Sequence, residues 1–483
     1  MKKYRKILAA LLAGTLAVGM IPTMAFAEAL EEEEVFTGTG TGTGIDGDIV
    51  VEVEATADEI ISVTIVEQNE TVGIGSEAVE TLPGEIVDKQ SLQVDTISGA
   101  TVSSTGILDA VRLALEDAGV DAAQFDVAPA AVHDEEDVPA EDAVYDVDVV
   151  VVGAGGAGMT AAINVADAGK SVLIVESQAL VGGNSVRSTG GLNAAKTIYQ
   201  DENEFEESAG VEKTLATVAD AWADNEVITA LAEIVQEQWD AYQENPEGYF
   251  DSVELFELDT MVGGKGINDP DLVAALCENS AAAIDWLESV GATLQNVSSF
   301  GGASVKRIHR PVDDEGKVIS VGSYIIPILK ENLEARGIDL LLNTTATSII
   351  MEDGKAVGIE AVGADGGNVT VNAKAVILAT GGFGANLEKV SELKPELDGF
   401  MTTNAPGALG QGLEMAQAVG ADVVDLEQIQ IHPTVQFDTA TLITEGLRGD
   451  GAILVNADGE RFIDEVGTRI VYLNALMVLI III

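Results

Sequence analysis

The segment from Tyr145 to Glu176 constrains the fold of this chain more than any other. Residues 147–152 are almost all valine, which is typical of a strand buried on both faces of a parallel sheet. Gly153, Gly155 and Gly158 then form a GxGxxG motif. In such a motif the glycines allow a tight turn, a close approach of pyrophosphate to the backbone, and close packing of the next helix. The segment therefore predicts a strand–turn–helix unit whose helix N-terminus faces a phosphate group.

A second apolar strand is expected at 171–175, and an acidic residue, Glu176, ends it. A carboxylate 18 residues after Gly158 can accept a hydrogen bond from the ribose of an adenine dinucleotide. A lone GxGxxG is weak evidence because glycine-rich turns are common. Together with both strands and a helix at 157–168, however, it predicts dinucleotide binding, and the alternative is a structural βαβ turn.

The composition limits the class of protein and of partner. The 483 residues are enough for two or three domains, and a hydrophobic fraction of 47% is ample for packed cores. The net charge of −57, from 24 basic and 81 acidic residues, repels nucleic acid and suits a salty milieu or a cationic partner. A site for an anionic substrate would therefore need local arginine and histidine. The single cysteine, Cys277, excludes disulfides within the chain and a CxxCH haem site, and we expect it in the core.

The first 45 residues are expected to lie outside the folded domains. Residues 1–27 are typical of a secretory signal, with a basic start, an apolar stretch at 7–21 and the small-residue cleavage site Ala25-Phe26-Ala27. We therefore expect an exported, extracytoplasmic protein, with an uncleaved anchor as the alternative. Residues 28–45 are acidic and then repeat TGTGTGTG, which is typical of a flexible linker.

Residues 46–120 are predicted to form a small α+β domain. Residues 46–66 alternate apolar and polar side chains, as in an antiparallel hairpin or meander. Residues 121–144 are rich in alanine, proline and acids, and we expect them to be an acidic, solvated linker.

The motif D-x-x-S-G-A-T ends at Thr101, directly before an amphipathic helix expected at 105–118. From the residues alone it is a turn that contains glycine, with Ser103 or Ser104 as the helix cap. The motif and the preceding ETVGIG resemble the small FMN-binding domain in which a threonine hydroxyl is joined to FMN through a phosphoester. The resemblance implies that Thr101 carries covalent FMN and that a separate flavin transferase attaches it.

The rest of the chain has the alternating pattern of an α/β protein. Strands are expected at 338–350 and 367–379, and helical periodicity covers 203–240, 270–290 and 408–419. Glycine-rich loops such as VGGNSVRSTGG bring backbone N–H groups to the surface, as phosphate- and flavin-binding loops do.

From about residue 145 to 469 the chain resembles the flavoprotein of the fumarate reductase and succinate dehydrogenase family, most closely its soluble, exported flavocytochrome c type. The shared motifs, in order, are GAGGAG, GGNS, STGG, ATGGF, GALGQG, IQIHPT, ITEGLRGDGAILVN and GERFIDEVGTR. The resemblance implies a Rossmann-like FAD-binding domain with a parallel sheet at 145–428, followed by the start of a capping domain at 429–483.

The resemblance also implies a set of FAD-binding residues. They are Gly153, Gly155, Ala157, Gly158, Glu176, Gly183, Asn184, Ser185, Gly190, Gly191, Ile349, Thr380, Gly381 and Gln411. The family usually has aspartate where this chain has Gln411, and glutamine can still form a hydrogen bond there. In RIHRP, His309 and Arg310 either line the flavin cavity or belong to a structural turn. No metal site is expected.

The catalytic residues are also implied by the resemblance. His432 and Thr444 would bind one carboxylate of the substrate, and Arg469 would donate the proton. Arginine rarely gives up a proton, so such a donor needs a positive environment and an acid that reloads it. Glu445 and Arg448, three residues apart, would form that relay. Taken singly, such a pair is usually solvated and a lone histidine is usually a core residue.

The C-terminal residues depart from the family. After Arg469 the chain continues as IVYLNALMVLIIII, and the second substrate-binding histidine and arginine of the family have no counterpart. We therefore expect the chain to be truncated and not to be a competent reductase by itself. As a helix, the last 14 residues would span about 21 Å, short of the roughly 30 Å of a bilayer core.

The primary functional hypothesis is an exported reductase of an α,β-unsaturated, fumarate-like carboxylate. Hydride would come from FAD N5 and the proton from Arg469, and electrons would enter from a membrane-bound donor through the FMN on Thr101. The alternatives are a flavin-dependent dehydrogenase of the ketosteroid type, and an FMN electron-carrier module with an inactive remnant of a reductase.

Overall fold

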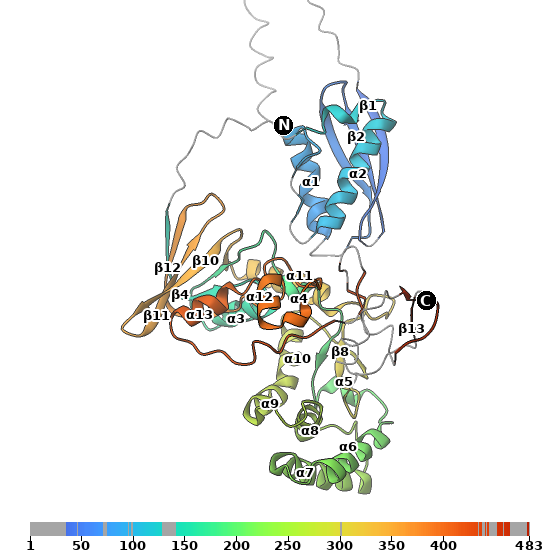
Figure 1. Ribbon diagram of the computed structural model, residues 1–483, viewed down its shortest axis with the longest axis vertical. Coiled ribbons are helices and arrows are strands. Elements are labelled where there is room, and N and C mark those ends of the chain that lie inside the picture. Colours follow the sequence, from blue (N-terminus) through green and yellow to red (C-terminus); the bar gives the residue numbers. More distant parts are fainter. Residues whose placement is uncertain are drawn as a thin grey trace, which may run out of the picture.

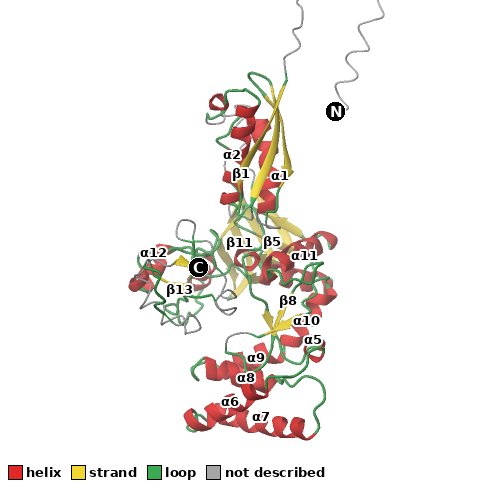
Figure 2. Ribbon diagram, turned by 90° about the vertical axis from the view of Figure 1, so that its right-hand side faces the viewer, coloured by secondary structure: helices red, strands yellow, loops and turns green. Residues whose placement is uncertain are grey.

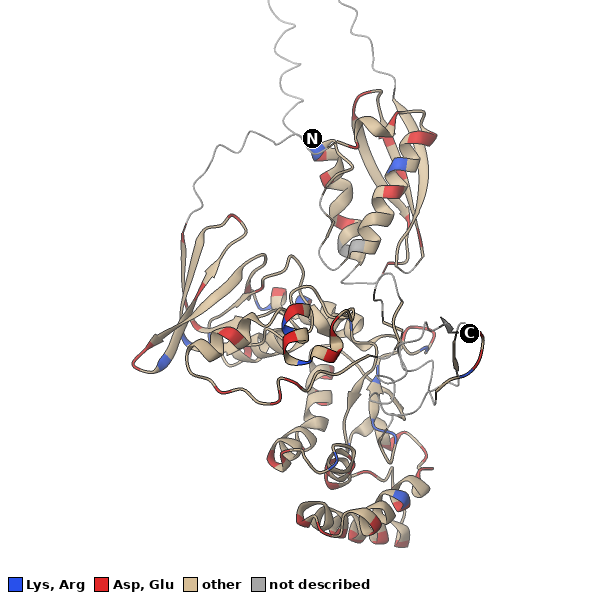
Figure 3. Ribbon diagram, viewed as in Figure 1, with Lys and Arg blue, Asp and Glu red and all other residues tan. Residues whose placement is uncertain are grey.

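The computed structural model describes most of the chain between Val35 and Ile463, together with a short C-terminal strand. The described residues are 35–45, 47–70, 75–94, 96–97, 100–127, 142–299, 302–432, 434–436, 440, 442–443, 452–456, 458–463 and 481–482. Among these residues, no helix is long and apolar enough to cross a bilayer. In Figure 3, acidic residues occur along the ribbon of both the N-terminal domain and the larger domain, so the negative charge is not confined to one domain.

The N-terminal domain packs two helices on a three-stranded antiparallel sheet of order β1–β2–β3 (Figure 1). Its elements are β1 (Phe36–Thr43), β2 (Asp48–Ala55), β3 (Ile60–Glu67), α1 (Gly75–Lys89), α2 (Thr101–Asp117) and the 3-10 helix η2 (Ala122–Gln124). The antiparallel hairpin or meander predicted at 46–66 is confirmed: β2 and β3 pair antiparallel and, with β1, form a meander. Alternate residues of β2, including Ile49 and Val51, are fully buried in one core with the two helices.

Strand β1 shows that the flexible linker expected at 28–45 is wrong for its second half. A Thr-Gly repeat has a period of two, so its glycines lie on one face of a strand and its threonines on the other. The glycine face lies on α2. An added Cβ on Gly38, Gly40 or Gly42 would overlap the carbonyl oxygen of Ala114, Ala110 or Gly106, respectively. The repeat therefore lets the backbones of strand and helix approach closely.

Replacing Gly40 with valine is expected to destabilise this domain by about 3 kcal/mol, the upper end of overpacking costs, because the clash is with backbone. Thr41→Val, on the exposed face of the same strand, is the control and should change stability by less than about 0.5 kcal/mol. Hydrogen exchange of the α2 amides measures the effect. Equal protection of α2 in the two variants would contradict this account of the repeat.

Helix α2 begins at Thr101 rather than at 105, so the prediction that Ser103 or Ser104 caps it is wrong. The N-cap residue is Ala100, and both serines are buried inside the helix. Ser104 Oγ donates to the carbonyl oxygen of Ala100 at 2.8 Å and accepts from the amide of Ile97 at 3.1 Å. The serine therefore holds the preceding loop against the first turn.

The acidic linker expected at 121–144 is shorter than predicted, because both of its ends join folded domains. Asp121 caps η2, and Phe125 is buried in the N-terminal core. The carbonyl oxygen of Phe125 accepts from the amide of Leu92 at 2.7 Å. At the other end, a strand already begins at Ala143. Apolar residues at the borders of an acidic segment thus continue the neighbouring cores.

The larger domain is built on a six-stranded sheet of order β10–β11–β12–β4–β5–β9. Its strands are β4 (Ala143–Val152), β5 (Val172–Val175), β9 (Asp339–Leu341), β10 (Thr345–Glu352), β11 (Lys355–Val362) and β12 (Asn368–Leu378). The neighbours β12, β4, β5 and β9 are parallel, which confirms the predicted parallel sheet. The single strand expected at 338–350 is wrong: a turn at Asn343, with φ of +49°, separates β9 and β10, which lie at opposite edges of the sheet.

The larger domain also contains the helices that cover both faces of this sheet and those of a separate helical subdomain. They are α3 (Gly156–Asp167), α4 (Gly183–Val186), α5 (Ile198–Asp201), α6 (Ser208–Ala221), α7 (Glu226–Glu244), α8 (Val253–Gly263), α9 (Pro270–Glu278), α10 (Ser280–Ser289), α11 (Val321–Ala335), α12 (Leu387–Leu393), η3 (Pro395–Leu397) and α13 (Gln411–Ala418). Met159 of α3 packs with Val151 on one face, together with residues of α11. Met415 of α13 packs with Val150 on the other. Consecutive valines of β4 point to opposite faces, which explains the unbroken valine run.

A helical subdomain of α6 to α9 lies below the sheet in Figure 2. The predicted helix at 270–290 starts as expected, because the Asp269 side chain accepts from the amides of the first turn. It is broken at Asn279 into α9 and α10. Cys277 is fully buried, which confirms its place in the core. The remaining strands are β6 (Leu192–Asn193), β7 (Asn296–Ser298), β8 (Ile308–Arg310), β13 (Leu454–Val455) and β14 (Ile481–Ile482), the last two paired with each other.

A buried ion cluster joins the helical subdomain to the segment that leads into β8. The guanidinium of Arg307, 1% exposed, bonds Asp251 Oδ1 at 2.7 Å and Asp259 Oδ2 at 2.9 Å. Burial by itself lowers the pKa of Arg307, but the charges and hydrogen bonds of the two aspartates outweigh it and raise that pKa. The guanidinium of Arg307 therefore stays charged at every physiological pH.

Candidate flavin site

The carboxyl ends of three neighbouring parallel strands form the candidate site. Gly153 follows β4, Glu176 follows β5 and Thr380 lies two residues after β12. The amide of Gly153 donates to the carbonyl oxygen of Val175 at 2.8 Å, and the amide of Ala379 donates to the carbonyl oxygen of Val152 at 2.8 Å. These hydrogen bonds join the ends of the three strands, so the turns that follow the strands begin at the same edge of the sheet. This is the edge of an open α/β sheet at which ligands bind.

Two glycines of the GxGxxG motif are required by packing. Gly153 has a φ of +104°, and an added Cβ there would lie 2.4 Å from the carbonyl oxygen of Ala379. A Cβ on Gly158 would overlap the carbonyl oxygen of Gly153. These residues bring α3 onto the sheet, as the motif predicts.

Four other glycines of the predicted set face open space. A Cβ added to Gly155 would meet no atom closer than 3.8 Å, and at Gly183, Gly190 and Gly381 it would meet nothing within 4 Å. Gly155 is also the N-cap of α3, where the helix dipole favours an anion. Bare backbone at a helix N-terminus fits the pyrophosphate of a dinucleotide. Gly191 differs, because its Cβ would overlap the carbonyl oxygen of His309.

The carboxylate of Glu176 is held in a fixed orientation at this edge. Its Oε2 accepts from the amide of Ala154 at 2.8 Å and its Oε1 from the amide of Gln178 at 2.9 Å. An ionised carboxylate has about four acceptor positions, so the side chain can also accept from a ribose hydroxyl. The geometry fits the predicted contact to the ribose.

Asn184 and Ser185 join the loops of the site. Asn184 Nδ2 donates to Asn404 Oδ1 at 2.7 Å, and Asn184 Oδ1 accepts from the amide of Ala405 at 2.6 Å. Ser185 Oγ accepts from the amide of Gly156 at 3.1 Å, which leaves its own hydrogen for donation. The contact to Asn404, across 220 residues, could not be predicted from the sequence because no motif or period marks it.

The other predicted cofactor residues lie on three different elements. Ala157 is in the first turn of α3, and Gln411 starts α13 next to Gly410, whose φ is +88°. Thr380 packs closely on Gly412, where an added Cβ would overlap its Oγ1. Ile349 lies on β10, three strands away from β4 in the sheet, and packs against the core beneath α13. The structure thus does not bring Ile349 together with the glycine loops.

His309 has a structural role in this fold. Its ring is fully buried, with Nδ1 at 2.9 Å from the carbonyl oxygen of Arg307 and Nε2 at 2.7 Å from Thr197 Oγ1. The pKa of His309 is lowered by burial, so the neutral ring donates through one nitrogen and accepts through the other. His309 therefore has a structural role, as one alternative for RIHRP held, but it lies in strand β8 and not in a turn.

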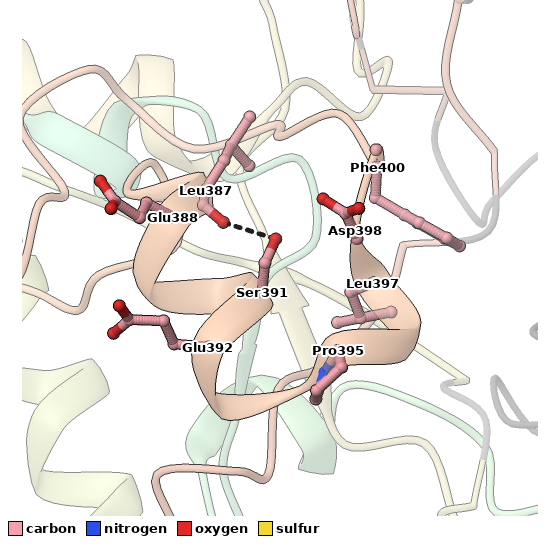
Figure 4. Close-up of a pocket in the computed structure, with 9 residues that line it drawn as sticks. Leu387, Glu388, Ser391, Glu392, Pro395, Leu397, Asp398 and Phe400 are labelled. Carbon is pink, nitrogen blue, oxygen red and sulfur yellow. Dashed lines mark hydrogen bonds between the residues drawn. The ribbon is translucent and has the colours of Figure 1, made fainter.

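One cavity among the described residues does not suit a flavin or a carboxylate. It has a volume of about 820 Å³ and lies against α12 and η3 (Figure 4). Glu388, Glu392 and Asp398 line it, and their charges repel anions. A smaller, mostly apolar cavity of about 260 Å³ lies beside Gly156 and Ser185, at the glycine edge. The glycine edge is therefore the better candidate for the flavin site.

Most of the predicted catalytic residues cannot be placed. Thr444, Glu445, Arg448 and Arg469 lie outside the described residues, and of Thr101 only the backbone is described. The side chain of His432 is partly buried, with Nδ1 at 2.9 Å from the carbonyl oxygen of Thr434. The catalytic, substrate-binding and flavin-attachment roles of all these residues stay predictions.

Comparison with known proteins agrees with a dinucleotide-binding site at the glycine edge of the sheet. Residues 148–250 and 239–479 match the model of an FAD binding domain. Residues 44–116 match that of an FMN-binding domain. The chain belongs to the fumarate reductase and succinate dehydrogenase flavoprotein family. The family confirms the Rossmann-like FAD-binding fold and the preceding FMN-binding domain that the sequence predicted.

Three relatives show how far the similarity extends. The chain is 35% identical to an NADH:fumarate oxidoreductase of Klebsiella pneumoniae over 87% of the chain and 39% of the relative. It is 40% identical to a cytochrome-type fumarate reductase of Shewanella frigidimarina over 67% of the chain and 48% of that protein. It is 34% identical to a urocanate reductase of Eggerthella lenta over 97% of the chain and 70% of that protein. The chain thus spans about half or less of the first two relatives.

A solved structure supports the fold. The open conformation of a flavocytochrome c3 fumarate reductase matches with a TM-score of 0.55 and 35% identity, over 69% of this chain and 51% of that one.

Gly155 leaves room for a ligand and Gly158 does not, so substitutions at the two positions should affect FAD binding and folding separately. Gly155→Ala is expected to leave the melting temperature unchanged, because the added methyl group meets no protein atom closer than 3.8 Å, but to raise the Kd for FAD about 10-fold or more. Gly158→Ala is the matched comparison and should lower the melting temperature. FAD titration and thermal unfolding of the two variants check this. Normal FAD affinity in Gly155→Ala would place the pyrophosphate elsewhere.

Proposed function

We propose that the protein represented by this chain is an exported, flavin-dependent reductase of an α,β-unsaturated carboxylate, with a fumarate-like acid as the leading substrate. The observation that carries the proposal is made at the carboxyl edge of the sheet. There, Glu176 lies together with glycines whose missing side chains leave room for a ligand, namely Gly155, Gly183, Gly190 and Gly381. The names of the relatives, which include fumarate, acrylate and urocanate reductases, support the substrate class. Residues 1–27 support export.

The proton would be delivered by this chain's own residues. Arg469 in GTR donates it to the carbon next to the one that accepts hydride, and Glu445 with Arg448 reloads the donor. His432 and Thr444 bind a substrate carboxylate, which needs cations in a protein of net charge −57. The order of the motifs along the chain supports these roles.

The two flavins supply the redox chemistry, with electrons entering through FMN and leaving from FAD as hydride. The FMN-binding domain would hold its flavin covalently on Thr101, which a flavin transferase attaches. A covalent flavin suits an exported protein because it cannot diffuse away. The electron donor would be membrane-bound.

Anaerobic assay of the protein that this chain represents, with reduced methyl viologen, tests the proposal. We expect viologen oxidation with fumarate, acrylate or urocanate, and none with saturated acids. Dye-coupled oxidation of a ketosteroid without reduction of any acid would favour the dehydrogenase alternative. Covalent FMN without bound FAD, and without turnover, would instead identify an FMN electron-carrier module.

A further inference from the structure

A buried carboxylate lies at the start of the two helices of the FMN-binding domain. Glu70, between β3 and α1, is only 6% exposed. A carboxylate so deeply buried is stable only where hydrogen bonds and favourable charges surround it.

The contacts of Glu70 converge from three elements. Ser103 Oγ, itself 1% exposed, donates a short hydrogen bond to Glu70 Oε2. An added Cβ on Gly44, just after β1, would overlap Oε1, and one on Gly75 would overlap Oε2. The carboxylate therefore fills a space that these glycines leave open between β1, α1 and α2.

The position is favourable because both helices begin there. Gly75 is the first residue of α1, and Ser103 belongs to the first turn of α2, which starts at Thr101. Helix N-termini stabilise a negative charge. On the other side of the same turn, Ser104 holds Ala100 and Ile97 of the D-x-x-S-G-A-T loop. The first turn of α2 is thus fixed by Glu70 from one side and by its own loop from the other.

We propose that Glu70 is the positioning residue for covalent attachment of the flavin at Thr101. This inference rests on the proposed attachment. The step joins Thr101 Oγ to the phosphorus on the FMN side of FAD and breaks the pyrophosphate bond. AMP leaves with the electron pair, and the hydroxyl proton passes to a base of the transferase. Glu70 already accepts from Ser103, so its role is to hold the turn that presents the hydroxyl.

Positioning of this kind affects rate more than binding. A misplacement of about 1 Å at a reacting atom can cost about 100-fold in rate. The transferase would still bind the FMN-binding domain, because a change at the buried Glu70 leaves the surface of that domain unchanged. A defect in Glu70 should therefore lower kcat for flavin attachment and leave KM for the chain near its normal value.

The test uses flavin-free chain, FAD and a flavin transferase, with in-gel fluorescence after denaturation as the measure of attachment. Glu70→Ala and Ser103→Ala are expected to lower kcat about 10-fold or more. Glu70→Gln keeps an acceptor for Ser103 and should retain most of the rate. Glu67→Gln, an exposed acid on β3, is the matched control.

Each outcome decides between specific explanations. Normal kcat in Ser103→Ala, or in a folded Glu70→Ala, would overturn the positioning role. A rate defect in Glu70→Gln as large as in Glu70→Ala would also overturn it, because charge rather than geometry would then matter. If Glu70→Ala does not fold, Ser103→Ala decides alone. A fluorescent band that persists in Thr101→Ala would refute the attachment site itself, independently of Glu70.

Discussion

Replacing Arg307 with methionine is expected to destabilise the helical subdomain by about 3–5 kcal/mol. The substitution keeps an unbranched apolar stem but leaves two buried carboxylates, Asp251 and Asp259, without their cation. Gln200 Nε2 and the amide of Ser304 would still donate to them, yet neither carries charge. The loss is large because the desolvation of both aspartates has already occurred in the fold.

Urea unfolding followed by tryptophan fluorescence measures this effect, since Trp222 and Trp239 lie in the helical subdomain. Arg336→Met is the control. Arg336 bonds Asp167 Oδ1 at 2.7 Å, but at the surface, where such a pair contributes less than about 1 kcal/mol. The raised pKa of Arg307 keeps the guanidinium charged at any pH below the ordinary pKa of arginine, so the difference between the variants should not change from neutral to mildly alkaline pH. Similar midpoints for both variants would contradict the account.

The sequence predicted the sheet and its glycine edge because those features follow local rules. The valine run of β4 and the spacing of Gly153, Gly155 and Gly158 are determined by strand burial and by close turn geometry, which neighbouring residues fix. The structure adds a distinction that the motif does not contain. Gly153 and Gly158 are required by packing, whereas Gly155 faces open space.

Features that depend on distant partners could not be predicted. The Thr-Gly repeat has the composition of a linker, and only the small residues of α2 reveal it as a strand. The bond between Asn184 and Asn404 likewise joins segments whose proximity depends on the whole fold. Glu70 begins the ETVGIG motif, but the motif does not show that the side chain is buried against Ser103, because its environment comes from three separate elements.

The predicted proton delivery gives the largest effect on activity. In a version of the protein restored to full length, Arg469→Ala is expected to lower turnover of the preferred acid about 1,000-fold, within the usual range for general acid catalysis. The FAD content should not change, because a proton donor stabilises the transition state and does not hold the cofactor. Arg469→Lys should keep part of the activity, since an ammonium group gives up its proton more readily than guanidinium.

The reloading step can be separated from the donation step. Glu445→Gln is expected to slow steady-state turnover by starving the donor, but the first turnover of a pre-reduced enzyme should remain close to normal because Arg469 begins protonated. Stopped-flow absorbance of the flavin under single-turnover conditions, compared with the viologen assay, distinguishes the two steps. Arg336→Ala, a surface arginine paired with Asp167, is the control and should match the unmodified chain. Near-normal steady-state turnover in Arg469→Ala, at full FAD content, would show that another group supplies the proton.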